Sequence, residues 1–168
     1  MSLEERIAAA VAMNVTLVKP NVFRIEDEYV AKECSHFGAH HELTMANLAG
    51  RLGIPVPRPL GVFEVKGSHY FVAEFIDGVY RSELAPEEQL RAIEQLEGYV
   101  FTLLKTGINP NEALWNENSL YVEAEGKLYV FDFESWRARY SSDSWLFESY
   151  ARIFQGFKEQ IEPSNATV

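Results

Sequence analysis

Three polar residues beside expected β-strands have side chains that could bind a ligand. Asp132 stands between Phe131 and Phe133, and an acidic residue between aromatic residues at a strand end either caps a turn or binds a ligand. Lys32, in the segment YVAKE, offers a cation, although taken on its own it is better explained as a solvated lysine at a strand end. Asn118 precedes the strand segment SLYV, where an Asx turn is one explanation and a ligand role is another.

Histidine and cysteine are the other residue types here that could bind a metal ion or act as a nucleophile. His36 and His40 would share one face of a helix, but we expect residues 36–39 to form a loop before a helix. Neither has an acidic or cysteine partner at the spacing of a zinc site. Cys34 lacks the His and Asn arrangement that would activate a thiol, so we expect it to pack in the protein.

The composition limits the classes of protein that this chain can belong to. The 168 residues carry 25 acidic and 15 basic side chains, for a net charge of −10, which disfavours nucleic acid as a partner. No apolar run reaches the roughly 18 residues of a membrane span. The single cysteine excludes an internal disulfide and is typical of a reducing compartment. We therefore expect one cytoplasmic domain that binds neither nucleic acid nor membrane.

The first half of the chain alternates helical and strand patterns. Ser2 and Glu5 form a capping-box pattern for a helix over 2–13, and residues 40–53 carry apolar residues on successive turns and end at Gly53. β-Branched and aromatic segments separated by Pro, Asn, Asp and Gly predict strands. The expected strands are Val15–Val18, Val22–Ile25, Tyr29–Lys32, 60–65 and 69–75.

The second half is mainly helical with one hairpin. Residues 86–105 carry a helical apolar stripe that starts at Pro86 and ends at Thr106-Gly107. SLYVEA and KLYVFDF predict a hairpin, and 144–161 predicts an amphipathic helix. The fold class is therefore α+β, with a five-stranded antiparallel sheet and one inserted helix, followed by a helical part that carries a small hairpin.

This order of elements resembles the protein-kinase-like superfamily. Lys32 in YVAKE matches the strand lysine that holds the α- and β-phosphates of ATP, and Glu42 matches the helix acid that pairs with it. The stretch ELTMANLAGRLGIPVPRPLG resembles small atypical (RIO/KEOPS-type) kinases and aminoglycoside phosphotransferases. The resemblance implies one kinase-like domain with an N-lobe over 1–78, a reduced C-lobe over 79–161 and a flexible tail over 162–168.

Further motifs extend the resemblance to the expected ligands, ATP and Mg²⁺. FVAEFIDG resembles the hinge, where the backbone of Glu74, Phe75 and Ile76 would contact adenine. LYVFDFE resembles the metal-binding DFG or DFE motif, in which Asp132 would bind Mg²⁺. Asn118 resembles the catalytic-loop asparagine and would be a second metal ligand.

Two motifs depart from the family. The turn Lys19-Pro20-Asn21 stands where kinases have a glycine-rich loop, so Lys19 would have to contact the phosphates by charge. The loop before Asn118 lacks the HxD motif. With one extra residue in this loop, Glu112 would take the place of the catalytic base.

The resemblance leaves two functions open. The first is a small atypical Ser/Thr protein kinase-like phosphotransferase that uses Mg-ATP on a hydroxyl of a protein or a small molecule. The second is a pseudokinase that binds or regulates a partner without phosphotransfer. Because the few residues after Glu134 leave room only for a reduced lobe, we expect a partner protein or a homodimer.

Overall fold

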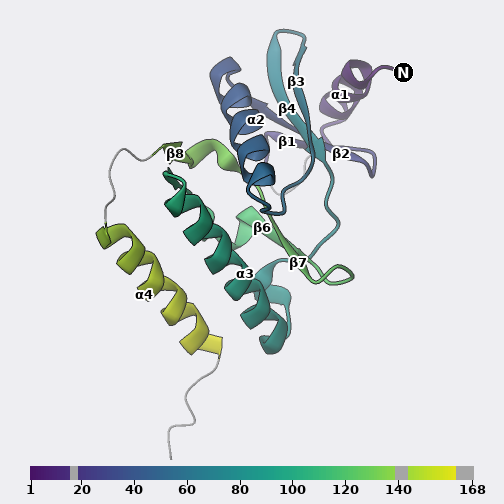
Figure 1. Cartoon of the computed structure of the whole chain (residues 1–168). Coiled ribbons are helices and arrows are strands. Elements are labelled where there is room, and N and C mark those ends of the chain that lie inside the picture. Colours follow the sequence, from purple (N-terminus) through teal and green to yellow (C-terminus); the bar gives the residue numbers. More distant parts are fainter. Residues whose placement is uncertain (16–18, 139–143, 162–168) are drawn as a thin grey trace, which may run out of the picture. The chain divides into compact units, whose positions relative to one another are not determined.

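The computed structural model describes residues 1–15, 19–138 and 144–161. They form two compact units, divided between Ile76 and Asp77 (Figure 1). The predicted strand at 15–18 lies largely outside these residues, and the predicted tail at 162–168 lies wholly outside them.

The first unit contains an antiparallel sheet with the strand order β1-β2-β4-β3. The sheet has four strands among the described residues, so the predicted number of five is not exact, and the fifth predicted strand is the one at 15–18. The amide of Arg24, a residue of β1, donates a hydrogen bond to the carbonyl of Val15 (3.0 Å). The elements of this unit are α1 (Leu3–Ala12), β1 (Val22–Ile25), β2 (Tyr29–Cys34), α2 (His36–Arg51), β3 (Pro59–Val65) and β4 (Ser68–Glu74).

The two helices of this unit pack on the two faces of the sheet (Figure 1). Successive side chains of a strand point to opposite faces, so Tyr70 and Val72 of β4 contact the core that includes Ile7 of α1. Phe71 and Ala73 are buried as well and belong to the alternate set, on the face that α2 covers. Each residue of β2 and β4 can therefore be assigned to a face from its position in the strand.

The start of α2 differs from the prediction. We expected a loop over 36–39, but the helix begins at His36, with Ser35 as its N-cap. The Ser35 hydroxyl accepts a hydrogen bond from the amide of Gly38 (3.0 Å), which satisfies one of the free donors of the first turn. His36 and His40 consequently share a face, and their rings contact each other edge-to-face with centroids 4.8 Å apart.

The second unit contains two long helices, a hairpin and short connecting elements. The bounds predicted for the helices α3 (Pro86–Lys105) and α4 (Ser144–Ile161) match the structure. The strands β6 (Ser119–Val122) and β7 (Lys127–Val130) form the predicted hairpin. The short elements around them were not predicted. The unit consists of η1 (Arg81–Glu83), α3 (Pro86–Lys105), β5 (Ile108–Asn109), η2 (Asn116–Asn118), β6 (Ser119–Val122), β7 (Lys127–Val130), η3 (Phe133–Ser135), β8 (Arg137–Ala138) and α4 (Ser144–Ile161).

Helices α3 and α4 pack against each other through their apolar stripes. Leu96, Val100 and Leu103 of α3 and Phe154 of α4 are fully buried or nearly so. Lys158 of α4 forms an ion pair with Glu97 of α3 (2.6 Å). The chain combines helices with sheets whose strands pair antiparallel, so the α+β class is confirmed. No helix of the described residues is long and apolar enough to span a membrane.

We expect Ile7→Ala to lower the free energy of unfolding by about 2–5 kcal/mol, because Ile7 is fully buried and the change leaves a cavity. Urea unfolding followed by circular dichroism measures this. Met13→Ala, at an exposed position just after α1, is the control and should change stability by less than about 0.5 kcal/mol. Equal effects of the two changes would contradict the packing of α1 on the sheet.

Candidate functional site

Lys32 lies in the middle of the sheet and points toward α2. It pairs with Phe71 of β4 and with Val22 of β1, while its neighbour Ala31 belongs to the face that α1 covers. Strand alternation therefore directs Lys32 to the opposite face. Only 8% of Lys32 is exposed, so its charge needs a partner within the protein.

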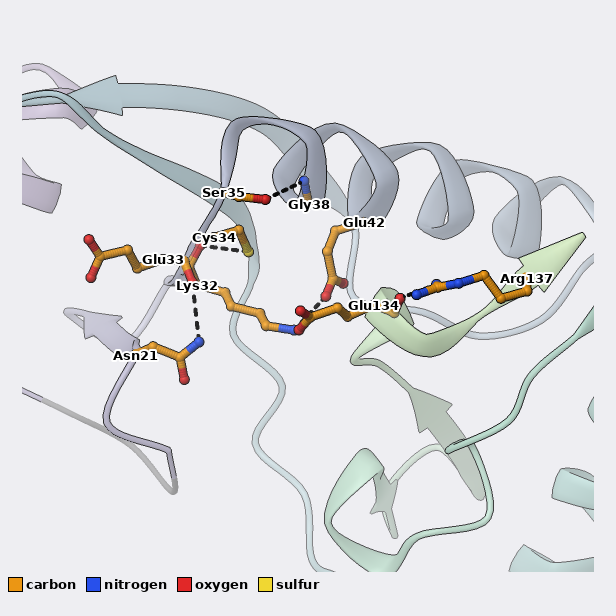
Figure 2. A network of polar contacts seen from close by, with 9 residues as sticks. All are labelled: Asn21, Lys32, Glu33, Cys34, Ser35, Gly38, Glu42, Glu134 and Arg137. Carbon is orange, nitrogen blue, oxygen red and sulfur yellow. Dashed lines mark hydrogen bonds and ion pairs between the residues drawn. The ribbon is translucent and has the colours of Figure 1, made fainter.

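Glu42 of α2 provides that partner. The buried residues of α2 are Ala39, Glu42, Ala46 and Ala49, which lie on one face of the helix. The alanines allow the helix backbone to approach the sheet, and Glu42 is the one charged residue among these four. Its carboxylate accepts a hydrogen bond from Lys32 Nζ (2.5 Å), as Figure 2 shows.

The surroundings of Lys32 fix the end of β2. The amide of Glu33 donates to the carbonyl of Asn21 (2.8 Å) and the side-chain amide of Asn21 donates to the carbonyl of Glu33 (3.1 Å). These bonds tie β2 to the turn before β1 (Figure 2). In that turn the carbonyl of Lys19 accepts from the amide of Val22 (3.0 Å). The turn is closed without a glycine, and a role for Lys19 at phosphates stays a prediction.

The segment after β4 corresponds to the predicted hinge. The amide of Glu74 already donates to the carbonyl of Arg58 (3.0 Å), and the amide of Phe75 donates to the carbonyl of Glu28 (2.8 Å). Ile76 makes no backbone hydrogen bond to any described residue. Of the three amides in the predicted hinge, that of Ile76 is therefore the one left to donate to a ligand.

Asn118 is a buried polar residue of the second unit that hydrogen bonds hold in place. It is fully buried, and its side-chain amide donates to the carbonyl of Glu112 (3.0 Å). Its own carbonyl accepts from the amide of Phe131 (3.0 Å). The side-chain oxygen of Asn118 has no hydrogen-bond partner among the described residues. A buried oxygen without a donor is unfavourable and is suited to a cation that binds there.

Asp132 follows Phe131, the residue just after β7 whose amide is bonded to Asn118. Its backbone has φ 64° and ψ 67°, the left-handed region, which residues with a Cβ seldom adopt. Phe133 and Trp136, both 1% exposed, contact each other edge-to-face with centroids 4.7 Å apart and anchor η3 just after it. Packing thus holds Asp132 in a strained conformation of the kind that clusters at functional sites.

The donor set of the second unit fits the expected Mg²⁺. Mg²⁺ binds oxygen ligands from one or two carboxylates and keeps several waters, and Asp132 supplies a carboxylate while Asn118 supplies an unsatisfied amide oxygen. The position five residues before Asn118, where the family has its catalytic base, is occupied by Ala113, which is 2% exposed and cannot accept a proton. Its neighbour Glu112 is partly exposed and is therefore the residue that could reach a substrate.

One further group of polar residues in the second unit could not be predicted from any local sequence pattern. Ser82 in η1 donates its amide to the side-chain oxygen of Asn116 (3.1 Å), and the side-chain amide of Asn116 donates back to the Ser82 hydroxyl (3.0 Å). Arg81 donates to the carbonyl of Leu114 (2.5 Å). η1 therefore holds the loop between Glu112 and Asn118, although 34 residues of sequence separate Ser82 from Asn116.

Comparison with known proteins supports a fold rather than a close relative. No protein-family model matches the sequence, and no curated protein matches it. Two crystal structures of WbdD, one described as a bifunctional kinase-methyltransferase, match 80% of the chain with TM-score 0.56 and 21% identity. The kinase PK-1 of the Cydia pomonella granulovirus matches 80% of it with TM-score 0.55 and 16% identity.

The chain has a protein-kinase-like fold. It spans 34% of the WbdD chains and 58% of the PK-1 chain, so what those kinases do as whole proteins does not transfer to it. The predicted superfamily resemblance is confirmed at the level of the fold. The roles of the individual site residues stay predictions, which the geometry described above makes specific.

We expect the changes Lys32→Met and Glu42→Leu each to lower stability by about 3–5 kcal/mol, because each removes one member of a buried ion pair and keeps the other. The double variant should recover most of this loss, since it replaces the pair by apolar side chains of similar size. Urea unfolding of all four proteins gives the coupling energy. Losses that simply add in the double variant would show that the two side chains are not coupled.

Proposed function

We propose that this chain is a small phosphotransferase that binds Mg-ATP and transfers phosphate to a hydroxyl of a protein or a small molecule. In this proposal Lys32 contacts the α- and β-phosphates, Asp132 and Asn118 bind Mg²⁺, and Ile76 offers its backbone to adenine. The buried ion pair between Lys32 and Glu42 is the observation that carries the proposal.

The ion pair supports a nucleotide role because burying two charges costs free energy that a purely structural contact would not require. Two charges removed from water lose several kcal/mol of hydration each, and apolar residues of similar volume are often as stable. A charged lysine held in one direction is, however, what a polyphosphate requires. Glu42 keeps Lys32 ionised and limits the directions in which its side chain can point.

The second unit supports the metal part of the proposal. When bound, Mg²⁺ would neutralise charge on the β- and γ-phosphates. Asn118 would satisfy its side-chain oxygen, which has no donor among the described residues, and Asp132, whose backbone is left-handed, would contribute its carboxylate. Because the chain carries a net charge of −10, nucleotide binding should depend strongly on the divalent cation.

Whether Glu112 can act as a catalytic base distinguishes a phosphotransferase from a pseudokinase. As a base, it would accept the proton of the attacking hydroxyl, a role that typically contributes 10²–10⁴-fold to the rate. Its backbone carbonyl is fixed by Asn118 (3.0 Å), which places it in the same loop as the expected metal ligand. The turn at Lys19–Asn21, which lacks glycine, favours the second candidate, a pseudokinase with weak nucleotide affinity.

We expect Mg-ATP to bind measurably by isothermal titration calorimetry and to bind much more weakly when Mg²⁺ is removed. Lys32→Met and Asp132→Asn should each weaken binding by about tenfold or more, the loss typical of a charge-assisted contact. Lys105→Met, at an exposed position in the last turn of α3, is the matched control. Binding that survives both site changes unaltered would contradict the nucleotide role.

We expect Glu112→Gln to reduce transfer of label from [γ-³²P]ATP by about 10²-fold or more, since a neutral amide cannot accept the proton. Glu112→Asp should keep part of the activity, and both variants should bind Mg-ATP like the unaltered chain. Label transfer unaffected by Glu112→Gln would exclude this residue as the base. Nucleotide binding without any transfer would instead establish the pseudokinase.

A further inference from the structure

The second unit contains a cleft of about 400 Å³ that the kinase-like site does not use. It opens between η1, the start of α3, the loop before η2 and the end of α4. The residues that line it are Arg81, Ser82, Gln89, Ile93, Leu114, Asn116, Phe157, Gln160 and Ile161. The lining thus combines one cation with side-chain amides and apolar side chains.

Arg81 is the unusual residue of this cleft. It is only 8% exposed, and it forms no ion pair with a carboxylate of the described residues. Its guanidinium donates one hydrogen bond to the carbonyl of Leu114 (2.5 Å) and lies 5.9 Å from the centre of the Phe157 ring. The Nε–H group has no partner among the described residues. Burial lowers the pKa of Arg81, and no neighbouring acid opposes this shift.

A buried cation without an anion is unfavourable, because neither water nor a carboxylate compensates its charge. We propose that the cleft binds a small organic carboxylate with an apolar body, and that the carboxylate pairs with the guanidinium of Arg81. The Nε–H group of Arg81, which has no acceptor among the described residues, would donate a hydrogen bond to a carboxylate oxygen. Planar carboxylates also match the planar fork of a guanidinium.

The single positive charge of the cleft favours a ligand with one negative charge over a dianion. Arg81 is the one basic residue in the lining of the cleft, so a single negative charge neutralises it. A phosphate dianion would leave excess negative charge in a chain that already carries −10. Ile93, Leu114, Phe157 and Ile161 offer apolar contacts to the rest of the ligand, so a branched aliphatic acid fits this chemistry better than acetate.

Such a ligand would act on the loop that carries Glu112 and Asn118. Leu114 and Asn116 line the cleft and are held by Arg81 and Ser82 of η1. An anion on Arg81 would fix the side chain that binds the Leu114 carbonyl, so the carboxylate would order this loop. The proposal concerns binding alone and does not depend on ATP, so it can fail or succeed separately from the phosphotransferase.

The test follows the Nε–Hε resonance of Arg81 by nuclear magnetic resonance in the full chain without nucleotide. The resonance is assigned by its loss in Arg81→Lys. Isovalerate should shift it in a saturable way, whereas isovaleramide, the neutral analogue of the same shape, should not. No shift with isovalerate, or equal shifts with both compounds, would overturn the proposal. Tighter binding of inorganic phosphate than of isovalerate would overturn the preference for a monoanion.

A charge variant at the rim provides a second test that spares the buried residues. Gln160→Glu adds a negative charge to the exposed wall of the cleft and should weaken isovalerate binding by about tenfold, because like charges repel. Ala151→Glu adds the same charge at an exposed position of α4 outside the lining and should leave binding unchanged. Equal weakening by both variants, or by neither, would contradict binding at Arg81.

Discussion

The buried ion pair between Lys32 and Glu42 constrains the first unit more than any other contact. Neither charge can be left alone in this environment, so β2 and α2 must keep the separation that allows the hydrogen bond of 2.5 Å. The small side chains of Ala39, Ala46 and Ala49 make that separation possible because they bring α2 close to the sheet. The pair explains why a charged residue is retained on a helix face that is otherwise apolar.

The second unit, like the first, contains buried polar groups that lower its stability, and they lie in its loops. Asn118 is fully buried, yet its side-chain oxygen lacks a donor among the described residues, and Asp132 adopts a left-handed backbone. Both features cost stability, and Phe133 and Trp136 offset that cost by close packing. Arg81 is a third case, and its different surroundings point to an anion rather than a metal ion.

Local pattern predicted much of the fold, and the errors have physical causes. The helices at 86–105 and 144–161 carry apolar stripes that predict them, and for the first of the two Pro86 and Thr106-Gly107 also mark the bounds. The start of α2 was missed because His36 and Gly38 are weak helix formers, although the Ser35 cap was the available signal. The pairing of Ser82 with Asn116 joins distant segments, and no local pattern could indicate it. Lys32 and Glu42 were found only through the order of several motifs.

The most direct test of the central claim observes Lys32 itself. The chain is labelled with ¹³C at the lysine ε-carbons, and the Lys32 signal, assigned with Lys32→Arg, is followed during titration with a non-hydrolysable Mg-ATP analogue. We predict that the Lys32 signal shifts with saturation at one equivalent and that adenosine, which lacks phosphates, leaves it in place. A Lys32 signal that stays fixed while the analogue binds would contradict the claim that the ion pair with Glu42 holds Lys32 for a polyphosphate.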